Sequence, residues 1–183
     1  WASRFLANSQ SIRRYLIEKH RINPDRIDVI TNGVDMNRFR PATPLEKVEG
    51  KKRLGFAPGH IVIGVIANLR PVKGLENFVR AAAVVFRRDS HARFVIVGEG
   101  PLKESLKRLA ADLGIGDIIV FAGSSSDVRP ILSAFDVGVL CSLSEGFSNA
   151  ILEYLAVGLP VVATNIGGNG EQVQDQMTGC LLP

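Results

Sequence analysis

Six short runs of apolar, largely β-branched residues recur along this chain, and the segments between them have helical spacing. The runs are 27–30, 60–68, 92–98, 117–123, 136–142 and 160–164. Nearly every position in them is hydrophobic, which is typical of parallel strands buried on both faces. The helical segments are 75–88, 102–114, 126–135 and 148–158, and Gly114 and Gly158 stand where helices would end. This alternation predicts an α/β fold with an open parallel sheet flanked by helices.

An earlier helix is predicted over residues 12–20, with Ser9 or Ser11 as its N-cap. The segment 39–50, FRPATPLEKVEG, has a linker-like composition and is interpreted as a loop. A length of 183 residues suits one well-packed domain, so residues 1–183 are taken as a single domain. Because the chain opens on WASRFLANSQ and ends just after an apparent strand, we expect it to be part of a longer polypeptide.

The composition is that of a globular protein and argues against other classes. The 22 basic and 18 acidic residues leave a net charge of +4, and the densest basic stretch, 51–53, has no aromatic residues beside it that could stack on bases. We therefore expect no nucleic-acid partner. Cys141 and Cys180 form no C-x-x-C pair and the three histidines stand apart, so no metal site is expected. No apolar run reaches the roughly 20 residues that span a bilayer, and we expect a cytoplasmic protein.

Ligands of open α/β sheets bind at the carboxyl ends of the strands. The loop after strand 136–142 carries Gly146, Phe147, Ser148 and Asn149 directly before a predicted helix. Backbone N–H groups at such a helix start, beside the positive end of the helix dipole, bind phosphate. Ser148 or Asn149 alone could also be a simple N-cap.

Charged residues surround this loop. Glu145 precedes the helix, and Glu153 lies within it, four residues after Asn149 and among apolar neighbours. Because carboxylates repel a diphosphate but accept hydrogen bonds from vicinal hydroxyls, we interpret both glutamates as groups that bind sugar hydroxyls. The loop after strand 60–68 supplies Arg70 and Lys73, two cations that could neutralise two phosphates.

Other motifs are weak or missing. The turn 98–101 lacks the third glycine of a dinucleotide fingerprint, so a hydride-transferring dehydrogenase is rejected. The sequence has no G-K-[ST] phosphate loop and no G-x-S-x-G nucleophile elbow. The turns 32–35 and 167–170 have the composition of ordinary tight turns, although both follow strands on the side where a ligand would lie.

The order of these pieces resembles retaining glycosyltransferase family 4, whose members have the GT-B fold. The segment 145–153, EGFSNAILE, resembles the E-x7-E element of that family. The other pieces in the family's order are ANS (7–9), VITNGVD (29–35), LRPVKG (69–74), VIVGEGP (95–101), FAG (121–123), GLPVVATNIGG (158–168) and TGCLLP (178–183). The resemblance covers essentially the whole chain and implies the Rossmann-like, C-terminal half of a GT-B enzyme.

The resemblance implies a role for each residue of the loop. Glu145 would contact hydroxyls of the transferred sugar, and Glu153 would bind the ribose hydroxyls. Backbone amides around Phe147, Ser148 and Asn149 would hold the sugar and the diphosphate.

The remaining roles concern the phosphates and the base. Lys73 and Arg70 would stabilise the leaving phosphate. The turn that holds Ser125 and Asp127 would lie against the base. Many relatives carry an arginine five residues before the lysine, where this chain has Asn68, so Arg70 would have to act from a different backbone position.

The implied enzyme is a hexosyltransferase that moves a sugar from a nucleoside diphosphate to an acceptor hydroxyl of a glycan, lipid or small molecule, with retention at the anomeric carbon. No metal or other cofactor is expected. We expect an N-terminal domain, absent from this chain like the final C-terminal helices, to bind the acceptor, so that this chain alone is inactive. Peripheral association of the full-length enzyme with the cytoplasmic membrane face is compatible with this. The alternatives on the same fold are a non-catalytic nucleotide-binding domain, a nucleotide-sugar epimerase and a glycan phosphorylase.

Overall fold

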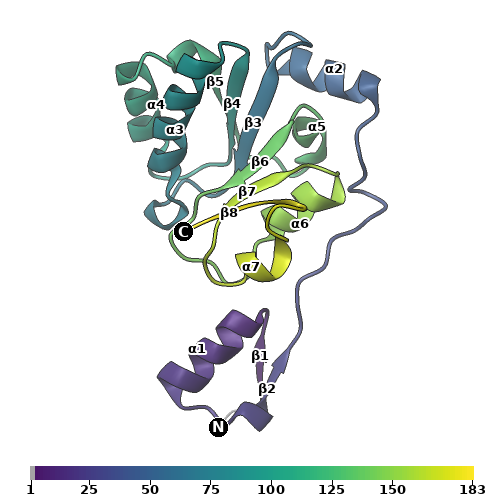
Figure 1. Cartoon of the computed structure of the whole chain (residues 1–183), viewed down its shortest axis with the longest axis vertical. Coiled ribbons are helices and arrows are strands. Elements are labelled where there is room, and N and C mark those ends of the chain that lie inside the picture. The colour runs from purple at the N-terminus through teal and green to yellow at the C-terminus, as the bar shows by residue number, and fades with distance from the viewer. Residues whose placement is uncertain (1–2) are drawn as a thin grey trace.

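Six parallel strands form the central sheet of the structure, a computed structural model that describes residues 3–183 (Figure 1). They are β3 (Ile61–Ile66), β4 (Ala92–Val97), β5 (Ile119–Gly123), β6 (Val137–Leu140), β7 (Val161–Thr164) and β8 (Gly179–Leu182). Their order in space is β5-β4-β3-β6-β7-β8, so the chain runs outward from β3 to one edge and then from β6 to the other. The predicted open parallel sheet is confirmed. The change of direction between β3 and β6 creates the crevice in which such folds bind ligands.

Helices cover both faces of this sheet. They are α2 (Pro44–Arg53), α3 (Leu75–Arg88), α4 (Lys103–Asp112), α5 (Arg129–Leu132), α6 (Asn149–Ala156) and α7 (Asn169–Gln172), with single 3-10 turns at Pro24–Arg26, Pro71–Lys73 and Gly116–Ile118. Successive strand residues point to opposite faces. Accordingly, Phe94 and Ile96 of β4 pack in the cluster under α3 and α4, whereas Val95 and Val97 pack with Tyr154 of α6 on the other face. The core therefore consists of two clusters, one on each face of the sheet.

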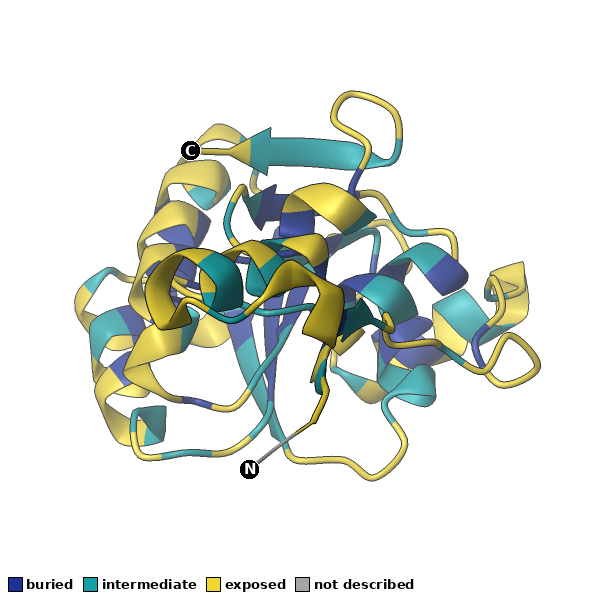
Figure 2. Ribbon diagram, turned by 90° about the horizontal axis from the view of Figure 1, so that it is seen from below, coloured by how far each residue is buried: buried dark blue, intermediate teal, exposed yellow. Residues whose placement is uncertain are grey.

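The N-terminal segment forms a separate unit. β1 (Phe5–Ala7) and β2 (Ile27–Val29) pair in parallel as a two-stranded sheet, and α1 (Gln10–His20) connects them. Figure 1 shows this unit at one end of the molecule, joined to the rest by an extended segment. Seen from that end in Figure 2, α1 is mostly exposed, and none of its residues is buried. The apolar run 27–30 therefore supplies a strand as expected, but not one of the main sheet.

The interpretation of segment 39–50 as a loop is wrong, because α2 begins at Pro44. Thr43 caps this helix: its side chain accepts a hydrogen bond from the Glu46 N–H (3.3 Å), and the Glu46 carboxylate accepts one from the Thr43 N–H (2.8 Å). This reciprocal capping box, with proline in the first turn, is readable in the letters TPLE. The linker-like composition of 39–50 had favoured a loop over this helix start.

The predicted helix ends agree with the structure better than the prediction for 39–50 does. Gly114 and Gly158 have φ values of 71° and 77° and stand directly after the C-cap residues of α4 and α6. Ser9, one of the two candidate caps of α1, accepts a hydrogen bond from the Ile12 N–H (3.0 Å). The helix expected over 126–135 is shorter, since only Arg129–Leu132 is helical.

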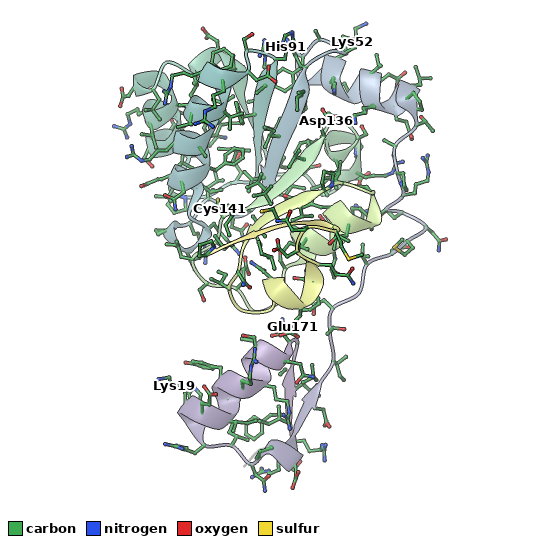
Figure 3. All side chains as sticks on the ribbon, viewed as in Figure 1. Lys19, Lys52, His91, Asp136, Cys141 and Glu171 are labelled. Carbon is green, nitrogen blue, oxygen red and sulfur yellow. The ribbon has the colours of Figure 1, made fainter. Side chains whose placement is uncertain are left out.

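Asp136, the residue just before β6, connects α2 to the sheet through ion pairs and a hydrogen bond (Figure 3). Its carboxylate pairs with Lys47 Nζ (2.6 Å) and Lys51 Nζ (3.0 Å) of α2 and accepts a hydrogen bond from the Val62 N–H of β3 (2.9 Å). Lys51 is only 5% exposed and also donates to two backbone carbonyls of the loop after α2. Burial alone would raise the pKa of Asp136, but the hydrogen bonds from these partners outweigh it and hold the pKa below its ordinary value.

Asp136→Asn is expected to lower the free energy of unfolding at pH 7 by about 1–3 kcal/mol, because a buried ammonium loses its ionic partner. The pKa of Asp136 is depressed in the folded state, so its stabilisation is present above the unfolded value of about 3.9 and is lost as the pH falls through the folded pKa. Urea unfolding should therefore show a gap between the two proteins at pH 7 that narrows below about pH 4. Asp117→Asn, on an exposed turn, is the control. An unchanged gap at low pH would contradict this account.

Candidate functional site

A hollow of about 330 Å3 opens at the carboxyl ends of β3 and β6, where the sheet changes direction. Its walls come from the ends of these strands, from the loop after each of them and from the first turns of α6. The lining residues are Ile66, Ala67, Asn68, Lys73, Leu140, Glu145, Phe147, Ser148, Asn149, Ala150 and Glu153. The structure thus brings together most of the predicted site residues from two loops about 75 positions apart in the sequence.

Glu145 and Lys73 form an ion pair across the hollow. Glu145 lies in the loop after β6 and its side chain is 11% exposed; Lys73 ends the 3-10 turn after β3 and is 23% exposed. The same carboxylate oxygen, Oε1, also accepts a hydrogen bond from Ser142 Oγ (2.8 Å). A carboxylate this deeply buried needs such partners. The two residues were predicted to act on different parts of a ligand, and the structure places them in direct contact.

The turn after β7 holds the Glu145 loop in place. The Gly168 N–H donates to the carbonyl of Gly146 (2.9 Å). Gly167 has a φ of 51°, and a Cβ there would collide with the carbonyl oxygen of Glu145, so only glycine fits. The letters GG were interpreted as an ordinary tight turn, but the turn supports the loop of the site.

The first turn of α6 presents unpaired donors to the hollow. Ser148 is the N-cap, and its hydroxyl accepts the Ile151 N–H (3.4 Å). The Ser148 N–H is already used, since it donates to the Gln172 side chain (2.9 Å), which returns a hydrogen bond to the Ser148 carbonyl (2.8 Å). In contrast, the N–H groups of Asn149 and Ala150 donate to no acceptor within residues 3–183.

The first turn of α1 has the same arrangement with the donors filled. Ser9 caps it as Ser148 caps α6. The next two N–H groups, of Gln10 and Ser11, donate to the two carboxylate oxygens of Glu171 at 2.9 and 2.8 Å. An anion therefore occupies at α1 the position that remains open to the hollow at α6.

Glu153 and Tyr154 lie side by side on α6. Glu153 is partly buried, and burial raises the pKa of its carboxyl, an effect that the positive charge of Arg38 partly offsets. Tyr154 is fully buried: its hydroxyl accepts the Ile66 N–H (2.8 Å), and its ring packs on Gly138, where a Cβ would collide with it. Tyr154 thereby fixes the position of Glu153 relative to the end of β3.

Ser125 and Asp127 do not line the hollow. Ser125 Oγ donates to the Asp127 carbonyl (2.6 Å), and the Asp127 carboxylate pairs with Arg38 (2.9 Å), which holds the pKa of that carboxyl below its usual range. No sequence pattern predicted a role for Arg38 or for Asn32, whose side-chain amide donates to the Asn149 side chain (2.8 Å). Both residues follow β2, and their contacts with the site are long-range.

Arg70 is exposed and is not among the lining residues of the hollow, whereas Asn68 is. The backbone explains the difference, because the chain turns at Arg70 to begin the 3-10 turn that carries Lys73 into the hollow. Arg70, the second predicted cation, therefore lies outside the hollow.

Cys141 lies beside the site without taking part in its surface (Figure 3). Its thiol donates to the carbonyl of Lys73 (3.3 Å), and burial raises its pKa to about 11. Both cysteines are free thiols. Among residues 3–183, His, Cys, Asp and Glu side chains nowhere gather in a group of three that could hold a metal ion. The helices of this same range are too short or too polar to cross a membrane.

Comparison with known proteins separates the chain into the two parts seen in the fold. Residues 60–183 match the family model described as "Glycosyl transferases group 1", and residues 1–38 match the one described as "Glycosyltransferase Family 4". The D-inositol 3-phosphate glycosyltransferase of Nocardia farcinica is 34% identical over 190 residues, which cover 99% of this chain and 42% of that protein. The chain thus spans less than half the length of such curated relatives.

Two solved structures show the same fold. Anabaena HepE in complex with UDP-glucose is 26% identical with a TM-score of 0.90, and the match covers all of this chain and 50% of that one. The C-terminal domain of a glycosyl transferase group 1 family protein from Francisella tularensis is 28% identical with a TM-score of 0.73, over 82% of this chain and 80% of that one. These matches confirm the expected relation to one half of a GT-B fold. The chain belongs to the group 1 glycosyltransferases.

Proposed function

We propose that this chain is the donor-binding part of a retaining hexosyltransferase and that the hollow between β3 and β6 holds a nucleoside diphosphate sugar. The observation that carries the proposal is the pair of unpaired N–H groups at Asn149 and Ala150. The Glu171 carboxylate at α1 shows what such a pair binds in this chain. A phosphate oxygen has the same needs as a carboxylate oxygen, and the positive end of the helix dipole favours it further.

Uridine diphosphate is the proposed leaving group. HepE was solved in complexes with UDP and with UDP-glucose, and the match to it covers all of this chain and 50% of HepE. In this proposal Lys73 meets the phosphate next to the sugar, while the start of α6 meets the diphosphate from the other side. Arg70 is exposed and could contribute only if its side chain reached over the 3-10 turn.

The glutamates bind hydroxyls in the same proposal. Glu145 is held by Lys73 and Ser142, so its remaining carboxylate oxygen can accept a hydrogen bond from the transferred sugar. Glu153 lies further along α6, one turn after Asn149, where it can accept both ribose hydroxyls. The turn with Ser125 and Asp127 borders the base through main-chain groups.

The proposed reaction breaks the bond between the anomeric carbon and the phosphate oxygen and forms a bond to the acceptor oxygen on the same face of the sugar. The acceptor's proton passes to the departing phosphate, which leaves as the nucleoside diphosphate. Negative charge grows on the diphosphate as the bond breaks, and preorganised donors lower the barrier by stabilising it. Lys73 and the α6 amides are placed to do this. The acceptor would be bound by a part of the enzyme outside residues 1–183.

Lys73→Ala is expected to weaken UDP binding about tenfold or more, the cost of losing a charge-assisted hydrogen bond. Uridine binding should change little, because Lys73 would contact only the diphosphate. Calorimetry with both ligands measures the difference. Lys52→Ala, at the opposite end of the sheet in Figure 3, removes the same charge as a control. Equal losses for UDP and uridine would contradict the assignment of Lys73 to the phosphates.

Glu153→Gln is expected to stabilise the empty chain at pH 7 while weakening its binding of UDP. The pKa of Glu153 is raised in the folded state, so the ionised carboxylate costs stability above the folded pKa, and the cost disappears below the unfolded value of about 4.3. The melting temperature of the variant should therefore exceed that of the wild type at pH 7 and match it near pH 4. Glu18→Gln, on the exposed face of α1, is the control. A gain that persists unchanged at pH 4 would refute the burial argument.

A further inference from the structure

The helix α7, although only four residues long, is hydrogen-bonded to the start of α6, to the end of β7 and to the start of α1. Gln172 exchanges two hydrogen bonds with Ser148 at the start of α6. Asn169, fully buried, donates to the Thr164 carbonyl at the end of β7 (2.9 Å). Directly before α7, Gly168 binds the carbonyl of Gly146 in the loop of the site. α7 is thus attached to both sides of the proposed phosphate-binding turn.

Glu171 extends this set of contacts to α1 (Figure 3). Its two carboxylate oxygens accept hydrogen bonds from the Gln10 and Ser11 N–H groups, 161 and 160 positions away in the sequence. The first turn of α1 has no acidic residue of its own. With Ser9 bound to the Ile12 N–H, the carboxylate of Glu171 completes the pairing of the first three amides of α1. The charge that this helix start favours therefore comes from α7.

The segment before α1 lies directly on the loop of the site. A Cβ on Gly146 would come within 3.2 Å of Asn8 Oδ1, and one on Gly168 within 3.0 Å of Ser9 Cβ, so the two segments are in close contact. A second hollow of about 450 Å3 lies between α1 and this loop, lined by Ser11, Ile12, Tyr15, Leu143, Ser144, Glu145, Ile166 and Gly167. Glu145 borders both hollows. A movement of α1 would therefore change the surroundings of Glu145.

We propose that Glu171 is a positioning residue of the donor site: its carboxylate clasps the start of α1 and, through α7, fixes α1 against the loop of Glu145. The clasp joins the segment that matches the family 4 model to the segment that matches the group 1 model. This inference rests on the proposed donor site. A ligand at the start of α6 and the clasp at the start of α1 share α7 and the 145–148 loop, so each stabilises the other by the same factor.

The experiment compares wild type with Glu171→Ala, which removes the carboxylate, and Glu171→Gln, which keeps one acceptor oxygen. Amide hydrogen exchange followed by NMR reports on the Gln10 and Ser11 N–H groups, and calorimetry reports UDP affinity. We expect Glu171→Ala to speed exchange at both amides about fivefold or more, as for a lost helix cap, and to weaken UDP binding about fivefold. Glu171→Gln should fall between. UDP should protect both amides in the wild type and not in Glu171→Ala.

Glu18→Gln removes an exposed carboxylate from the same helix and should change neither measurement. Unchanged exchange at Gln10 and Ser11 in Glu171→Ala would overturn the clasp. Faster exchange with unchanged UDP affinity would make Glu171 a helix cap only and would overturn the positioning role. Failure of the wild type to bind UDP would instead overturn the donor site, while the exchange rates without ligand would still decide whether the clasp exists. Should Glu171→Ala not fold, Glu171→Gln carries the same comparison.

Discussion

The ion pair between Lys73 and Glu145 joins the two loops that meet where the sheet changes direction. The side chain of Glu145 is nearly buried, and Lys73 and the Ser142 hydroxyl supply the polar partners that a buried carboxylate needs. The pair also sets the electrostatics of the hollow, because Lys73 compensates the charge of the carboxylate beside the proposed phosphate site. Lys73 can then contact a phosphate while it holds Glu145, and the two roles proposed for these residues become parts of one arrangement.

In the proposed function, the rest of the attraction for a diphosphate would come from the backbone. Helices α1 and α6 begin in the same way, each with a serine cap followed by two N–H groups that have no partner within the helix. At α1 the Glu171 carboxylate fills them; at α6, within the described residues, nothing does. The short helix α7 contacts both starts. The proposed ligand site and the contact between the two parts of the chain thus depend on the same few residues.

Local pattern predicted the fold, and long-range contacts limited the prediction of the site. Five of the six apolar runs predicted strands of the main sheet, β3 to β7, because parallel strands buried on both faces are nearly continuously hydrophobic. The start of α2 was missed although its capping box lies in the letters TPLE. Glu145 and Lys73 could be proposed because each lies in a loop that follows a strand, and Glu153 because it lies one turn into the helix after that loop, among apolar neighbours. Arg38 and Glu171 could not, since their partners lie about 90 and 160 residues away. That residues 1–183 form a single domain stays a prediction.

In the proposed function, the start of α6 binds the diphosphate of a nucleotide sugar. The most direct test is an NMR titration of the isotope-labelled chain with UDP, followed at the backbone amides. The account predicts that the Asn149 and Ala150 signals, whose N–H groups have no acceptor within residues 3–183, shift first and farthest, together with those around Lys73. Saturable shifts that leave Asn149 and Ala150 unmoved, or no shifts at all, would contradict it.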